Sequence, residues 1–243
     1  MNTLSRKQRE IRQRNELLLD IAESIICDGC HNELSMDRLA EISEYSKGTV
    51  YQHFSCKEEL LVHLCIRGMR TLVGLFKKAA AYTGNTRERI TAVCLAHRLY
   101  ARLMPLHFSM IQVIKGGPIR EKVSPESQQI VHDLEKAVIG TLMAVIIEAI
   151  EKNELELPPG IQPGDVLYGF WASSYGGLLL QTYEINYQEL RIDDPDASLE
   201  RMVQAHLDGL NWSPLTRNFD YRKTIKKLTN DQELSGHQHT AQH

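Results

Sequence analysis

The sequence predicts an all-α protein, and three patterns support that fold class. Apolar residues recur at spacings of three and four, helix-capping residues precede several of these segments, and no segment shows the alternation of a half-buried strand. The chain of 243 residues is long enough for a small domain joined to a larger one. We expect about nine helices, three in an amino-terminal head and the rest in a helical body.

Composition and charge are those of a globular protein with one basic end. Hydrophobic residues make up 42% and charged residues 24%, and the net charge is −3. Residues 1–14 nevertheless hold five Arg or Lys residues against one Glu, which suits a local contact with phosphate groups. The cysteine count is odd, the amino end lacks a signal-peptide core, and no stretch approaches the ~18 uncharged apolar residues of a membrane span. We therefore expect a cytoplasmic protein with no membrane partner.

The first four helices have clear boundaries. A helix over roughly 6–27 carries an apolar stripe, and Ser35 is a good N-cap for a second helix over 36–43. A tight connection leads to a third helix over roughly 47–53. The segment that begins at Phe54 opens a long fourth helix, whose first turn holds two acids that suit the positive end of the helix dipole.

Capping and breaking residues place the remaining helices. Asn85 and Glu88 form a capping-box pattern, a sixth helix lies between Pro105 and residues 115–118, and Ser124 with Pro125 starts a seventh. The last two helices are expected over about 165–184 and 197–211. We divide the chain into a head at 1–56, a body at 57–212 and a polar, mobile tail at 213–243.

The second and third helices form a helix-turn-helix, in which the second helix of the pair enters the DNA major groove. Leu39 and Ala40 are expected to pack on Val50 and Phe54. The outward face then offers polar side chains to base edges, and a tyrosine and a lysine reach phosphates together with the N–H groups at the start of the fourth helix. The outward side chains are Thr49, Gln52 and His53, and the phosphate contacts are Tyr51 and Lys57.

The segment "SMDRLAEISEYSKGTVYQHFSCKEEL" resembles the DNA-binding domain of the TetR (tetracycline repressor) family of bacterial transcription regulators, and the likeness extends over roughly residues 10–65. It implies a ligand-responsive, homodimeric repressor that binds a double-stranded DNA operator, responds to an unknown small-molecule effector, and has neither enzymatic activity nor a cofactor. Gln52 is the best candidate for reading a base, since its amide can pair with adenine. The implied DNA-binding residues are Ser35, Lys47, Gly48, Thr49, Tyr51, Gln52, His53 and Lys57.

One residue in the turn departs from the family pattern. Glu44 stands where the family usually has glycine. A non-glycine residue at positive φ is unfavourable by order 1 kcal/mol, so the turn is expected to be reshaped or strained.

The body is expected to hold the effector pocket and the dimer interface. The mixture of methionine, aromatic and histidine side chains suggests a largely apolar ligand with a polar handle, although each residue can equally be core. The pocket candidates are His97, Tyr100, Met104, His107, Phe108, Met143 and Trp171. The resemblance makes the last two body helices a four-helix bundle with their mates, although their stripe can instead be internal core. The interface candidates are Tyr168, Tyr175, Leu178, Leu199, Val203, His206 and Leu210.

Other interpretations remain open. Cys27, Cys30 and His31 are a weak metal or redox motif because a second pair of ligands is missing, so we expect no metal site. The basic tail segment 217–227 can be solvated or can contact phosphate. A ligand-insensitive architectural DNA binder of the same fold is the alternative function. A helical enzyme is the rival from another class, and the chain lacks the common catalytic motifs that would support it.

Overall fold

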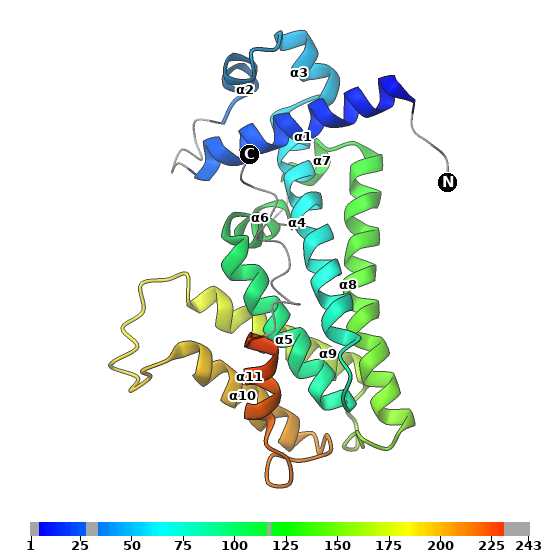
Figure 1. The fold of residues 1–243 in the computed structure, drawn as a ribbon, viewed down its shortest axis with the longest axis vertical. Helices are drawn as coiled ribbons and strands as arrows, with labels where there is room; N and C mark the ends of the chain where they lie inside the picture. The colour runs from blue at the N-terminus through cyan, green and yellow to red at the C-terminus, as the bar shows by residue number, and fades with distance from the viewer. Residues whose placement is uncertain (1–4, 28–33, 116–117, 231–243) are drawn as a thin grey trace. The chain divides into compact units, whose positions relative to one another are not determined.

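The computed structural model describes residues 5–27, 34–115 and 118–230, and in these residues it contains helices and no strand (Figure 1). The expected all-α fold class is therefore confirmed. Among the described residues, no helix is both long and apolar enough to cross a membrane. The chain divides into two compact units, each built from two separate stretches of sequence.

The first unit comprises residues 1–70 and 104–134. Its amino-terminal helices begin and end where the sequence predicts, whereas the four-residue α7 was not expected. The helices are α1 (Arg6–Cys27), α2 (Met36–Ser43), α3 (Lys47–His53), the first part of α4 (Lys57–Ala80), α6 (Pro105–Lys115), α7 (Pro118–Glu121) and the first part of α8 (Pro125–Glu151).

One apolar cluster holds the head together. Leu39 and Ala40 of α2 are buried in the same cluster as Val50 of α3 and Phe54, which follows it. This confirms the expected packing of the helix-turn-helix. Leu18 of α1 is fully buried in the same cluster, so α1 completes a three-helix head.

The second unit comprises residues 71–103 and 135–243. Asn85 and Glu88 cap α5 reciprocally, as expected, because each backbone N–H donates to the other side chain, at 3.1 and 2.9 Å. The unit's helices are the end of α4, α5 (Thr86–Leu103), the end of α8, α9 (Pro163–Leu180), α10 (Pro195–Gly209) and α11 (Tyr221–Asn230).

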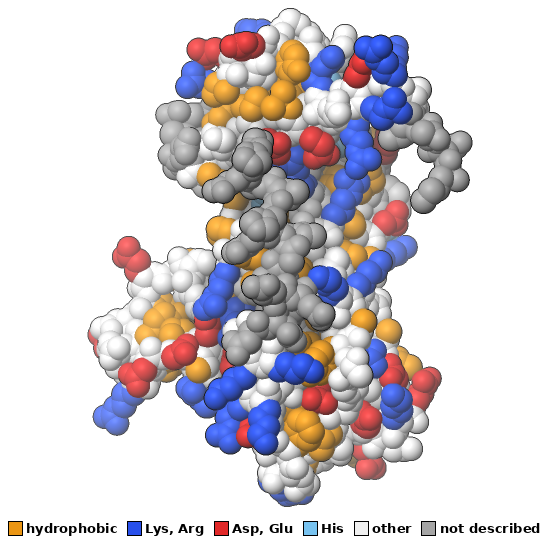
Figure 2. All heavy atoms as spheres, in the orientation of Figure 1, with side chains coloured by type: hydrophobic (Ala, Val, Ile, Leu, Met, Phe, Trp, Pro, Cys, Tyr) orange, Lys and Arg blue, Asp and Glu red, His pale blue; other side chains and the backbone are white. Residues whose placement is uncertain are grey.

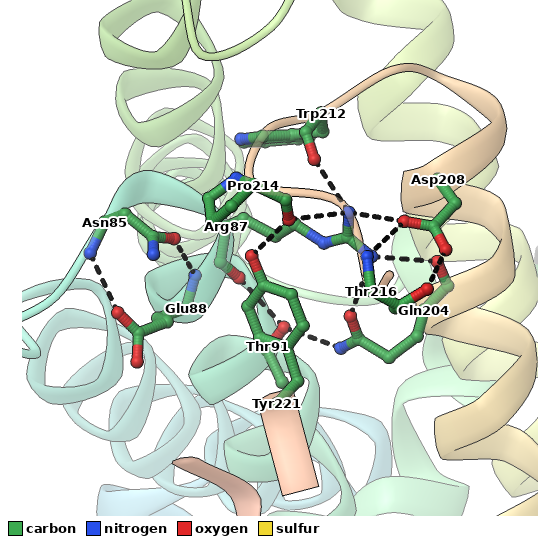
Figure 3. A network of polar contacts seen from close by, with 10 residues as sticks. All are labelled: Asn85, Arg87, Glu88, Thr91, Gln204, Asp208, Trp212, Pro214, Thr216 and Tyr221. Atoms are coloured by element: carbon green, nitrogen blue, oxygen red, sulfur yellow. Dashed lines mark hydrogen bonds and ion pairs between the residues drawn. The ribbon is translucent and has the colours of Figure 1, made fainter. Parts of the chain in front are cut away.

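Helix α11 lies in the segment that we expected to be a mobile tail. It packs on α5, and its Tyr221, Thr224 and Leu228 are buried. The rest of that segment, residues 231–243, lies outside the described residues. A buried arginine far away in sequence, Arg87, helps to hold α11 in place (Figure 3).

Candidate DNA-binding site

Two serine N-caps and one left-handed residue shape the helix-turn-helix. The Ser35 hydroxyl accepts the N–H of Arg38 at the start of α2, and the Ser46 hydroxyl accepts the N–H of Thr49 at the start of α3, both at 3.1 Å. Glu44 ends α2 at φ 56° and ψ 17°, and its N–H donates to the Glu41 carbonyl. The turn thus keeps the positive φ that glycine would adopt easily, and Glu44 bears the strain.

Helix α3 separates a buried face from an exposed face. Val50 and Phe54 are fully buried, whereas 48% of the Tyr51 surface is exposed. The exposed positions also include Lys47, Gly48 and Gln52, while Thr49 and His53 are half-buried. Because the inner face is used up in packing, the outer face is available to a ligand.

Two of the expected contact groups have partners inside the head. The Thr49 hydroxyl lies 2.8 Å from the Ser46 hydroxyl, so it is already hydrogen-bonded. Lys47 Nζ lies 2.8 Å from Asp37 Oδ2 on α2, and this hydrogen bond raises the pKa of Lys47. A phosphate that binds Lys47 must therefore compete with Asp37. The sequence pattern did not reveal these pairs, although serine directly before a helix is a recognisable cap.

His53 at the end of α3 is a weak candidate for a cation. Burial lowers its pKa, and the charge of Arg14 on α1 lowers it further. At neutral pH the imidazole is therefore neutral, and it can offer a hydrogen-bond donor and acceptor but no charge.

Hydrogen bonds from the start of α8 hold the start of α4 in place. Glu59 is buried and accepts hydrogen bonds from Ser124 N, Ser124 Oγ and Ser127 Oγ at 2.8, 2.8 and 2.5 Å. Burial opposes the ionised form, but these donors outweigh it and lower the pKa of Glu59. The carboxylate is thus held ionised in place, and the half-buried Lys57 stands at the first position of α4.

A single arginine fastens α1, which carries the basic residues of the amino-terminal end, to α4. The Arg67 guanidinium binds Glu16, Asp20 and Glu23, which are spaced along one face of α1, at 2.7, 2.6 and 3.3 Å. Arg67 also donates to the Glu16 carbonyl at 3.1 Å. The basic residues from Arg6 to Arg14 therefore belong to a helix that is anchored to the rest of the head.

The pocket candidates do not share one compact unit. Met104, His107 and Phe108 belong to the first unit, and the other four belong to the second. Within the second unit, His97 is buried with Nδ1 2.9 Å from Ser174 Oγ, whereas 45% of Trp171 is exposed. A cavity in this unit is lined by other residues, including Cys94, Ser174, Leu199, Val203 and Ile225. Tyr100 is buried and Met143 is half-buried.

The interface candidates divide between the inner and outer faces of α9 and α10. Leu178 and Val203 are buried within the subunit, and His206 stacks on Phe170 with ring centroids 5.3 Å apart. A Cβ atom on Gly177 would lie 2.6 Å from Leu199, so that leucine also packs against its own chain. Tyr175 and Leu210 are half-buried. Tyr168, by contrast, is 73% exposed.

The described residues contain no group of three or more His, Cys, Asp or Glu side chains that could hold a metal ion. Cys30 and His31 of the weak cysteine motif lie outside the described residues, and Cys27 is the exposed last residue of α1.

Comparison with known proteins agrees with the geometry of the head. The family model described as "Bacterial regulatory proteins, tetR family" matches residues 18–64, which run from α1 through α3 into α4. A structure of a tetR-family regulatory protein from Rhodococcus shares the fold, with a TM-score of 0.60 and 14% identity over 81% of this chain and 96% of that one.

Two curated relatives match only part of their own length. The HTH-type transcriptional activator FasR of Mycolicibacterium smegmatis is 34% identical over 91 residues, or 37% of this chain and 39% of FasR. An arginine–tRNA ligase of Brucella anthropi is 31% identical over 99 residues, or 37% of this chain and 17% of the ligase.

Three findings thus agree on residues 18–64: the capped helix-turn-helix, its shared apolar core, and the match to one family model. Residues 18–64 of the chain are therefore similar in sequence to the tetR family of bacterial regulatory proteins, and the described part of the chain shares the fold of a solved member of that family.

Proposed function

We propose that the protein is a sequence-specific, homodimeric DNA-binding regulator of transcription, most simply a repressor that responds to a small molecule. One observation carries this proposal: Val50 of α3 and Phe54 directly after it are buried, while α3 exposes Lys47, Gly48, Tyr51 and Gln52. Members of the tetR family are DNA-binding regulators without enzymatic activity, so we take the chain not to be an enzyme.

The contacts of α3 divide into those that read bases and those that hold the backbone. Gln52 is exposed, and its amide can pair with adenine in the major groove. The Tyr51 hydroxyl and Lys57 are suited to phosphates, as are Ser35 and the N–H groups at the start of α4. A Cβ atom on Gly48 would meet only Ser46 Oγ, at 3.9 Å, so its surroundings leave room for DNA to approach.

A dimer would present two copies of α3 to one operator. Two recognition helices about 34–36 Å apart would face successive major grooves of a near-palindromic site. Exposed apolar side chains on α9 and α10, among them Tyr168, Trp171 and Met202, supply a surface for the second copy.

An effector would act by preferring the spacing of recognition helices that does not fit DNA. Its effect is limited to the difference between its affinities for the two states. FasR is an activator, so the match does not favour repression over activation. The position of the operator relative to the promoter would decide the sign.

Competition gel shifts with operator and random DNA test the roles on α3. Tyr51→Phe should weaken binding to all DNA, because it removes a phosphate contact. Gln52→Ala should instead reduce the preference for the operator, by roughly 1–3 kcal/mol at one base pair. Gln129→Ala on α8, also an exposed glutamine, is the matched control and should change neither. Equal losses on both DNAs for both α3 variants would contradict the assignment.

A thermal-shift screen tests the response to a ligand. A small molecule that binds the native body should raise the melting temperature on saturation. If no molecule in a broad screen does so, while operator binding is intact, the architectural alternative is favoured.

A further inference from the structure

The connection between α9 and α10, residues 181–194, has the features of a contact surface, and we call it the arm. It projects from the ends of the two helices as a long loop of short turns (Figure 1). Loops of this length without secondary structure are uncommon and are usually functional or disordered. The arm is built from short-range contacts, such as the hydrogen bond from Ile192 N to the Tyr187 carbonyl at 3.0 Å.

The arm exposes large apolar side chains. Tyr183 is 58% exposed and Leu190 is 60% exposed, and Leu180, at the end of α9, is 50% exposed. Figure 2 shows apolar side chains gathered on this projection with acidic side chains around them. Contiguous exposed apolar surface of this kind marks an interaction site.

The charge of the arm narrows the choice of partner. Its charged side chains are four acids, Glu184, Glu189, Asp193 and Asp194, against the single cation Arg191. An acidic, apolar surface is poorly suited to DNA or to an anionic membrane, which attract basic segments. A protein surface with exposed apolar and basic side chains is the better match.

Helix α10 of the same chain offers such a surface. Met202 is 64% exposed, and the neighbouring Arg201 is exposed as well. The arm leads directly into α10, and Leu180 at the end of α9 is half exposed, so the arm adjoins the two helices of the proposed dimer face. In a two-fold dimer each subunit would contribute both surfaces. The same contact, arm against α10, would therefore form twice.

We infer that the arm docks on α10 of a second copy of this chain, with Tyr183 and Leu190 against the surface around Met202, and the acids facing Arg201. The inference rests on the proposed homodimer and adds a specific interface to it.

Analytical ultracentrifugation over a concentration series tests the inference. The double substitution Tyr183→Ser with Leu190→Ser should raise the dimer dissociation constant by about a hundredfold, because two apolar contacts are lost at each of two sites. Leu103→Ser, at a leucine that is 50% exposed at the end of α5, is the control and should leave the constant unchanged. Unfolding curves should coincide at concentrations where both proteins are monomeric.

A charge-swap pair provides a second, independent test. Arg201→Glu and Glu189→Lys should each weaken the dimer, and the two together should recover part of the loss. If the wild type is a dimer and the double arm variant has the same dissociation constant, the inference is overturned but the proposed dimer stands. A wild-type protein that is monomeric at every concentration would overturn both.

Discussion

At the scale of single residues, Glu44 shows where the sequence pattern and the backbone disagree. A glutamate at φ 56° costs about 1–2 kcal/mol, whereas glycine adopts this conformation freely but loses more chain entropy on folding. Glu44→Gly should therefore increase the free energy of unfolding by about 0.5–1 kcal/mol, measured by urea denaturation. Glu41→Gly, inside α2, should instead lower it by about 1 kcal/mol. A loss of stability in Glu44→Gly would show that the turn is not strained.

His107 predicts a pH dependence of stability. It is 1% exposed, and neither ring nitrogen has a hydrogen-bond partner in the described part of the chain. Burial lowers the pKa of His107, and the charge of Arg67 lowers it further. The carboxylate of Glu23 opposes this shift, since its Oε1 lies 3.7 Å from His107 Nδ1. The folded pKa lies below the unfolded value near 6.5, so the native state binds fewer protons. The contribution of His107 to the free energy of unfolding is therefore fully present above the unfolded pKa, and it is lost as the pH falls through the folded pKa.

Between pH 7.5 and 5, the wild type should therefore lose more stability than His107→Gln, by up to ~1.4 kcal/mol per pH unit for one proton. His132→Gln, at an exposed histidine, should follow the wild type. Denaturant midpoints across this pH range provide the measurement. Parallel curves for the wild type and His107→Gln would count against a lowered pKa.

The residues of α3 also mark the limit of what could be predicted. The inner pair Val50 and Phe54 followed from spacing alone, because a buried helix face repeats every three or four residues. The ion pair of Lys47 with Asp37 did not follow, because it joins two helices whose crossing geometry is set by the packed core. Sequence periodicity shows which side of a helix is free, but not which of its polar groups are already bonded.

At the scale of elements, α11 depends on Arg87, whose side chain is fully buried. Its guanidinium binds Asp208 and the Trp212 carbonyl, each at 2.7 Å, and lies over the Tyr221 ring with its central carbon 4.6 Å from the ring centroid (Figure 3). The Tyr221 hydroxyl in turn donates to the Pro214 carbonyl at 2.7 Å. Arg87 thus joins the start of α5 to the end of α10 and to α11.

Arg87→Ala should lower the free energy of unfolding by about 3–5 kcal/mol, because it removes the ion pair with Asp208 and the donor to the buried Trp212 carbonyl. Arg222→Ala, on the exposed face of α11, should change it by no more than ~0.5 kcal/mol. Chemical denaturation monitored by the fluorescence of Trp212 tests both. A small effect of Arg87→Ala would mean that water replaces the guanidinium and that α11 is held by its apolar face alone.

The same contacts explain why α11 could not be predicted. Its inner face offers few apolar residues, so its stripe is short. Its contacts include an arginine more than a hundred residues earlier in the chain, a pairing that local periodicity cannot show. The head helices, by contrast, carry their caps and apolar faces within one continuous segment, and their bounds could be predicted from it.

At the scale of the whole molecule, DNA binding and dimer formation should be linked. If the operator binds only the dimer, operator occupancy should rise in proportion to protein concentration when that concentration exceeds the dimer dissociation constant. Below that constant, occupancy should rise with the square of the protein concentration, so binding changes from second to first order. The arm variant Tyr183→Ser with Leu190→Ser should move this change of order to higher protein concentration, while its affinity for the operator at saturating dimer stays unchanged. Gln52→Ala should do the opposite, since it lowers operator affinity at every concentration without moving the change of order. Fluorescence anisotropy with a labelled operator, over a dilution series of each protein, separates the two. An arm variant that binds with unchanged, first-order isotherms at concentrations where ultracentrifugation finds monomers would show that one subunit suffices for operator binding.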